Sequence, residues 1–95
     1  MHVISRKAIC EFWEQHPDSK SSLTRWANAM EKNSFNSFSQ LKQAIPTADL
    51  VDNLIVFNIA GNKYRLIASI HFNRGKVYVR QILTHRDYDK GDWKR

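Results

Sequence analysis

The sequence predicts an α+β domain in which an N-terminal strand and two helices precede a three-stranded antiparallel β-meander, with the helices packed on one face of the sheet. Apolar residues recur at helical spacing between residues 5 and 32, and three β-rich runs lie between residues 54 and 84. Short glycine-containing loops separate these runs, as in β-hairpins. The 95 residues suffice for one modest core, so we expect a single domain over residues 1–95.

The first elements follow from a short apolar run and a helical pattern. His2-Val3-Ile4 is predicted to be a strand that joins the sheet. Ser5 is the expected N-cap of a first amphipathic helix, whose apolar residues keep helical spacing until Pro17 stops the pattern.

A second helix is predicted to begin after Asp18 or Ser19 and to end near Lys32. Its apolar stripe comprises Leu23, Trp26, Ala27 and Met30. We expect Trp13 and Trp26 to be core residues that cover the sheet. Residues 34–49 are the least regular stretch, with one helical turn expected over residues 40–44.

Two hairpin loops fix the register expected for the meander. The Gly61-Asn62 loop places Ala60 opposite Lys63, and an Arg74-Gly75 loop would place Asn73 opposite Lys76. Apolar side chains then share one face, which is the core side: Ile55, Phe57, Ile59, Tyr64, Leu66, Ala68, Ile70, Phe72, Val77, Val79 and Leu83.

The opposite face is expected to carry a polar row, Asn58, Arg65 and Thr84, and beside it an apolar row, Val56, Ile67 and Ile82. An exposed apolar strip tends to be covered. The tail from residue 85 to residue 95 is short and highly charged, so we expect another protein chain to cover the strip.

Positive charge is concentrated in the last third of the chain. Residues 1–62 contain six Lys/Arg and six Asp/Glu, whereas residues 63–95 contain nine Lys/Arg and three Asp/Glu, so the net charge of +6 lies entirely in the second part. This asymmetry predicts a polyanionic partner, most commonly nucleic acid. The alternative is a solvated basic face that only maintains solubility.

The composition argues against several classes of protein. A lone Cys10 excludes an internal disulfide, and the four histidines show no metal-ligand spacing. The sequence has no phosphate-binding glycine loop and no nucleophile motif, and we expect no metal and no cofactor. No run approaches the ~20 apolar residues that span a bilayer, so we expect a cytoplasmic protein without a membrane partner.

Two motifs resemble the HigB-type toxins of bacterial toxin–antitoxin pairs, in the RelE/ParE-like superfamily: VFNIAGNKYRLI at residues 56–67 and LTHRDYDKG at residues 83–91. The resemblance covers essentially the whole chain. It implies a RelE-like fold and a ribosome-associated endoribonuclease that cuts mRNA. It also implies a cognate antitoxin, of the helix-turn-helix HigA type, through which alone operator DNA would be bound.

The residues support such chemistry independently. Cutting RNA without a metal requires a base for the 2′-hydroxyl, cationic donors for phosphate and an acid for the leaving 5′-oxygen. The candidate catalytic residues lie on or beside the polar row: Arg65, His85, Tyr88, Lys63 and Lys90. The candidate RNA-binding residues are Arg80, Asn58, Thr84, Arg86, Arg74 and Lys76.

Each candidate role has a plainer alternative. Arg65 has forked donors for phosphate and Asn58 across the strand to orient it, but it could be an ordinary exposed strand arginine. His85 suits proton transfer near neutrality, or it could cap a strand end. Tyr88 could stack on a base or pass a proton, while Lys63 and Lys90 could compensate phosphate charge or be solvated. Trp93 could be a loose anchor or an RNA contact.

Three functions of different classes fit these residues. The first is an mRNA endoribonuclease, favoured because His85 and Tyr88 accompany Arg65. The second is a non-catalytic module that binds RNA or the ribosome through the same basic face. The third is a gyrase-inhibiting toxin of the ParE branch, because fold does not dictate function.

Overall fold

The computed structural model describes residues 1–94, and within them five strands form one mixed sheet in the order β1-β5-β4-β3-β2. The strands are β1 (His2–Ile4), β2 (Asp49–Val51), β3 (Leu54–Ile59), β4 (Tyr64–His71) and β5 (Lys76–Thr84). The helices are α1 (Arg6–Gln15), α2 (Lys20–Lys32), α3 (Phe38–Ala44) and α4 (His85–Lys90), with short 3-10 turns η1 (Pro17–Ser19) and η2 (Asp92–Lys94).

The α+β class is confirmed, but the sheet is larger than a three-stranded meander. β1 pairs in parallel with β5 at one side, and β2 pairs antiparallel with β3 at the other. The meander β3-β4-β5 forms the middle of this mixed sheet. Within residues 1–94, no helix is long and apolar enough to cross a bilayer.

The predicted helices α1 and α2 form within a residue or two of their expected limits. Ser5 precedes α1 as expected, but its side chain makes no capping hydrogen bond. Its backbone has φ 77°, in the left-handed region, which turns the chain from β1 into the helix. The helical turn expected over residues 40–44 is confirmed as α3, capped by the Ser37 hydroxyl, which accepts from the backbone N–H of Gln40.

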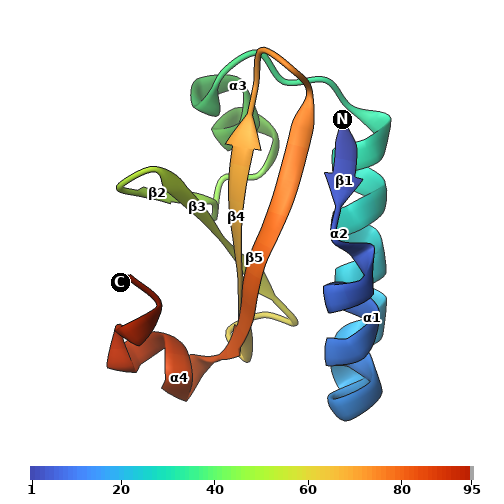
Figure 1. Ribbon diagram of the computed structural model, residues 1–95, viewed down its shortest axis with the longest axis vertical. Coiled ribbons are helices and arrows are strands. Elements are labelled where there is room, and N and C mark those ends of the chain that lie inside the picture. The colour runs from blue at the N-terminus through green and yellow to red at the C-terminus, as the bar shows by residue number, and fades with distance from the viewer. Residues whose placement is uncertain (95) are drawn as a thin grey trace.

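The main core lies between these helices and the sheet (Figure 1). The stripe of α2 is buried as predicted, and Trp26 packs edge-on against Phe57 of β3 with ring centroids 5.3 Å apart. Trp13 is partly buried against the same core. Both tryptophans therefore cover the sheet, as predicted.

The register between β3 and β4 is the predicted one. Asn58 pairs with Arg65 and Val56 with Ile67, around a turn at residues 60–63. Ala60 and Gly61 both have positive φ there, 54° and 68°. The glycine makes such a turn inexpensive, which explains why the sequence predicts this hairpin correctly.

The register between β4 and β5 differs from the prediction. The ladder closes at His71 and Lys76, so the turn spans residues 72–75 instead of Arg74 and Gly75 alone. A β-bulge then inserts Arg80, since Ala68 pairs with Val79 but Ile67 pairs with Gln81. Pairing beyond the bulge is offset by one residue from the prediction.

This offset reverses two side chains and breaks the predicted polar row. Ile82 pairs with Leu66 on the helical side, whereas Leu83 pairs with Arg65 on the opposite face. Thr84 lies opposite Tyr64, not opposite Arg65. The rows Asn58-Arg65-Thr84 and Val56-Ile67-Ile82 were therefore wrong in their third members.

The second face of the sheet is covered by the protein's own C-terminal segment, contrary to the prediction. Val56 and Ile67 are 2% and 1% exposed, and they form a second cluster with Trp93, which is 6% exposed. Figure 1 shows α4 on the side of β4 and β5 away from α1 and α2. Helices thus pack on both faces, because one tryptophan in a polar tail supplies the apolar surface that the strip needs.

Replacing Ile67 with Glu should unfold the protein, because it would place an unpaired carboxylate in the dry second cluster. We expect Ile67→Glu to lower the free energy of unfolding by more than ~3 kcal/mol. The matched control is Leu50→Glu, because Leu50 is 54% exposed and should change stability by less than ~0.5 kcal/mol. Urea denaturation followed by circular dichroism measures both, and a stable Ile67→Glu protein would contradict the buried second face.

Candidate active site

Arg65 lies on the second face of the sheet, near the end of β4 at which α4 begins. Its Nη1 donates to the carbonyl oxygens of Asn62 at 3.2 Å and of Tyr64 at 3.0 Å. The side chain is therefore oriented by backbone carbonyls, and no hydrogen bond from Asn58 is found in the part of the chain that the structure describes. Its Nε and Nη2 also lack a protein partner within residues 1–94, so they remain available to an anion.

Tyr88 of α4 lies against this guanidinium. The Cζ atom of Arg65 is 5.5 Å from the centroid of the Tyr88 ring, a cation–π distance. The same ring stacks on Trp93 with centroids 5.1 Å apart and an interplanar angle of 15°. Arg65 and Tyr88, which are 23 positions apart in sequence, are thus brought together as predicted.

His85 starts α4 immediately after β5. Its backbone N–H donates to the Lys63 carbonyl at 2.9 Å, which extends the pairing of β4 and β5 by one bond. Its Nδ1 lies 2.9 Å from Oδ2 of Asp89, one helical turn later. When Nδ1–H donates to this carboxylate, Nε2 is the nitrogen left to accept a proton.

Lys63 is held by an acidic residue from the helical layer. Its Nζ lies 3.1 Å from Oδ2 of Asp18, and the Tyr64 hydroxyl donates to Oδ1 of the same carboxylate at 2.7 Å. The hydrogen bonds from Tyr64 and then Lys63 lower the pKa of Asp18 below its usual 3.8. The bond to Asp18, followed by burial, raises the pKa of Tyr64 above 10.0.

The other predicted residues around α4 are distributed along the helix. Thr84 is its N-cap, and the hydroxyl accepts from the backbone N–H of Asp87 at 3.2 Å. Lys90 lies 3.9 Å from the Asp87 carboxylate, and both side chains are more than half exposed. Such an exposed pair is weak, so a phosphate anion can compete for Lys90. Arg86 is exposed.

Arg74, Lys76 and Arg80 lie farther from Arg65. Arg74 and Lys76 are at the opposite end of β4 and β5, about six residues or ~20 Å away at ~3.3 Å per residue. Arg80 is the bulge residue, and its guanidinium is 5.7 Å from the centroid of the Tyr78 ring. None of these three cations belongs to the group formed by Arg65, Tyr88 and α4.

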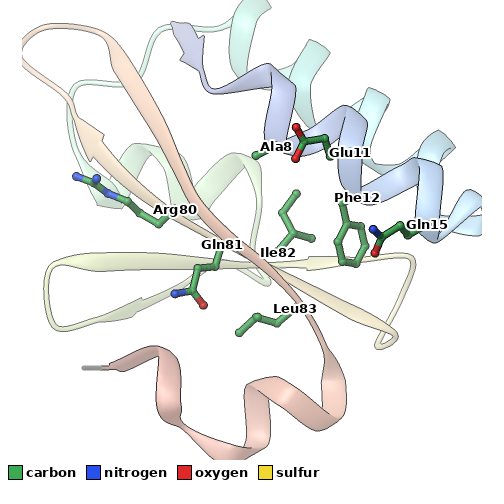
Figure 2. Close-up of a pocket in the computed structure, with 8 residues that line it drawn as sticks. All are labelled: Ala8, Glu11, Phe12, Gln15, Arg80, Gln81, Ile82 and Leu83. Carbon is green, nitrogen blue, oxygen red and sulfur yellow. The ribbon is translucent and has the colours of Figure 1, made fainter.

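A groove of about 440 Å³ separates α1 from the part of β5 that β1 does not reach. Figure 2 shows Phe12 and Ile82 between helix and strand, while Arg80 points away from α1. Its wall residues are Ala8, Glu11, Phe12, Gln15, Arg80, Gln81, Ile82 and Leu83. The groove contains no histidine and one cation, so it does not provide the groups that phosphodiester cleavage requires.

The group around α4 does provide them. Arg65 offers donors for a phosphate, and His85 and Tyr88 each have a titratable group for proton transfer. The site is open to solvent at one end, since His85 is half exposed while Tyr88 is partly buried. Within residues 1–94, no three His, Cys, Asp or Glu side chains gather to hold a metal ion.

Two contributing residues were not predicted from the sequence, and a third, Trp93, was predicted only in part. Asp89 orients His85, and only its i,i+4 spacing could have indicated this. Asp18 binds Lys63 and Tyr64 from 45 and 46 positions away, which no local pattern reveals. Trp93 was considered only as a loose anchor or RNA contact, but it is buried beneath Tyr88.

Nearly the whole chain is similar to known toxins. Residues 19–91 match the family model of the HigB toxin, described as the RelE-like toxic component of a toxin–antitoxin system. The chain is 35% identical over 92 residues, covering 94% of this chain and 88% of the relative, to "mRNA interferase toxin HigB" of Escherichia coli K12. It is 27% identical over 93 residues, covering 95% and 90%, to "mRNA interferase HigB" of E. coli O6:H1.

The bonds of Asp18 predict a pH-dependent stability. Because folding lowers its pKa, Asp18 stabilises the fold above pH 3.8 and loses this contribution as the pH falls through the lowered value. Because folding raises the pKa of Tyr64, its contribution is complete below pH 10.0 and is lost as the pH rises through the raised value. Asp18→Asn should therefore be less stable than the parent at pH 7, with a difference that shrinks in acid.

Urea unfolding between pH 2 and pH 8 measures this difference. Asp52→Asn is the control, because Asp52 is an exposed turn carboxylate for which no ion pair is found within residues 1–94. A stability difference for Asp18→Asn that stayed constant across the acid range would show that the carboxylate charge is not what holds Lys63 and Tyr64.

Proposed function

The chain belongs to the HigB family of RelE-like toxins, and on that premise we propose that it is an mRNA interferase, an endoribonuclease that cleaves mRNA and so inhibits translation. The observation that carries the proposal is the pairing of the Arg65 guanidinium with Tyr88, one helical turn from His85. The names of the relatives favour this activity over gyrase inhibition.

The reaction uses the RNA's own 2′-hydroxyl as the nucleophile. A base removes its proton, the 2′-oxygen attacks the adjacent phosphorus, and the bond to the 5′-oxygen breaks as that oxygen takes a proton from an acid. His85 and Tyr88 are the two groups that exchange these protons. The products are a 2′,3′-cyclic phosphate, which hydrolyses to a 3′-phosphate, and a 5′-hydroxyl.

Arg65 stabilises the charge that develops on phosphate. Its Nη1 donates to two carbonyls, so the guanidinium is already oriented when RNA arrives. Nε and Nη2 form the fork that donates to two phosphate oxygens. Lys63 and Lys90 contribute positive potential near the reacting phosphate. Each has a carboxylate partner at 3.1 Å or 3.9 Å, which makes them secondary to Arg65.

The remaining candidate residues contact RNA away from the scissile bond. Arg74, Lys76 and Arg80 extend the basic surface along the sheet. Arg86 lies in α4, Thr84 caps that helix, and Asn58 pairs with Arg65 in the sheet. A surface this long exceeds what one phosphate needs, which favours a long RNA as the substrate. We propose that this RNA is mRNA held on the ribosome in the cytoplasm. The partner that neutralises the activity is a cognate antitoxin, for which we propose the HigA type, with operator DNA bound through it.

Arg65→Ala should abolish growth arrest and lower the rate of mRNA cleavage by at least ~100-fold, the cost of removing one preorganised donor. The fold should survive, because the guanidinium lies outside both apolar clusters. Arg25→Ala removes an exposed arginine from α2 and serves as the control with full activity. Full toxicity of a folded Arg65→Ala protein would refute the role of Arg65.

Cleavage should persist in EDTA, either on free RNA that the enzyme accepts or under conditions that keep the ribosome assembled. The expected ends are 5′-hydroxyl and cyclic or 3′-phosphate, because the candidate groups are an imidazole, a phenol and cations. Ligation-based end mapping with and without a 5′-kinase step distinguishes them. Products with 5′-phosphate would indicate attack by activated water and would contradict the 2′-hydroxyl mechanism.

A further inference from the structure

The segment after α4 turns back under the helix. Gly91 ends α4 with φ 76°, in the left-handed region, and its N–H donates to the Tyr88 carbonyl at 3.1 Å. The following turn η2 (Asp92–Lys94) places Trp93 against Val56 and Ile67, where the indole is only 6% exposed. Trp93 is thus packed against the sheet and shielded from solvent.

Trp93 holds Tyr88 at two points. The indole Nε1–H donates to the Tyr88 carbonyl at 3.0 Å, and the two rings stack with centroids 5.1 Å apart and an interplanar angle of 15°. The hydrogen bond fixes the backbone of Tyr88, and the stacking fixes its ring. A residue held in both ways has little freedom to change rotamer.

The ring of Tyr88 in turn contacts Arg65. The Arg65 guanidinium is tied to two carbonyls through Nη1, and its Cζ lies 5.5 Å from the centroid of the ring. The order of contacts is therefore sheet, Trp93, Tyr88, Arg65. Since the tryptophan and the guanidinium both lie against the ring, a base could stack there only by displacing one of them.

We infer that Trp93 is a positioning residue for the RNA-cleaving site: it holds the Tyr88 ring, and through that ring the Arg65 guanidinium, in the geometry used for cleavage. It touches neither the RNA nor the reacting atoms. This inference rests on the proposed function and adds that Tyr88 acts through its hydroxyl and not as a stacking platform. Displacement of a catalytic group by ~1 Å can cost ~100-fold in rate.

The experiment compares variants that separate positioning from burial. Trp93→Leu keeps an apolar side chain on Val56 and Ile67 but removes the aromatic ring and the Nε1 donor, whereas Trp93→Phe keeps a ring. The control is Val77→Ala, because Val77 is fully buried in the main core and absent from the second cluster. All proteins are assayed at a temperature at which each is fully folded by circular dichroism.

We expect Trp93→Leu to lower kcat by about tenfold or more with little change in KM, and Trp93→Phe to recover most of the loss. Val77→Ala should lose stability but retain its kcat. In a Tyr88→Leu background, adding Trp93→Leu should change kcat by less than about twofold, because the ring through which Trp93 acts is already gone. A fully active Trp93→Leu protein, or an equal loss in the Tyr88→Leu background, would overturn the inference.

An NMR measurement that does not depend on RNA cleavage tests this inference separately from the proposed function. The Tyr88 ring should shift the NMR signals of the Arg65 Cδ protons upfield, and this shift should vanish in Trp93→Leu and persist in Trp93→Phe. An unchanged shift in Trp93→Leu would overturn the positioning role even if the parent proved inactive on mRNA. If Trp93→Leu does not fold, a Trp93→Phe protein that loses the shift and the activity would also contradict the inference, because stacking alone should suffice.

Discussion

Burial of Trp93 against Val56 and Ile67 is the interaction on which the candidate site depends. It buries Val56 and Ile67 on the second face of β3 and β4, so the middle of the sheet is apolar on both sides although the chain has only 95 residues. It also holds α4 against the sheet, where the Cζ atom of Arg65 lies 5.5 Å from the centroid of the Tyr88 ring. Without this contact, α4 would be six residues of polar helix, too short to be stable alone.

Acidic side chains lie beside some of the basic residues of the candidate site, and this affects which of them are available to bind a phosphate. Asp18 binds Lys63, Asp87 lies near Lys90, and Asp89 binds the Nδ1 of His85. Each of these three carboxylates is exposed enough for an incoming anion to displace it, but each lowers the local positive potential. Arg65 is oriented instead by the carbonyls of Asn62 and Tyr64, and no carboxylate within residues 1–94 forms an ion pair with it. This difference separates Arg65, which we propose as the principal phosphate-binding residue, from the two lysines.

Local patterns predicted α1, α2 and the β3–β4 register, because helical spacing and the Gly61 turn specify these elements within a few residues. The same reasoning failed for the register between β4 and β5. Gly75 is compatible with two different turns, and no sequence pattern around Arg80 indicates the β-bulge there. Of the site, the pairing of Arg65 with the region of Tyr88 was predictable from strand alternation. The contacts of Asp18 and Trp93 were not, since they depend on packing between distant segments.

We propose that the scissile phosphate binds at Arg65, between β4 and α4. The most direct measurement is a structure of the protein on a ribosome with an mRNA whose 2′-hydroxyl at the cleavage position is methylated, so that the nucleophile is blocked. We expect Nε and Nη2 of Arg65 to donate to that phosphate, with His85 and Tyr88 beside the 2′- and 5′-oxygens. A phosphate bound instead in the groove between α1 and β5, or near Arg74 and Lys76, would contradict it.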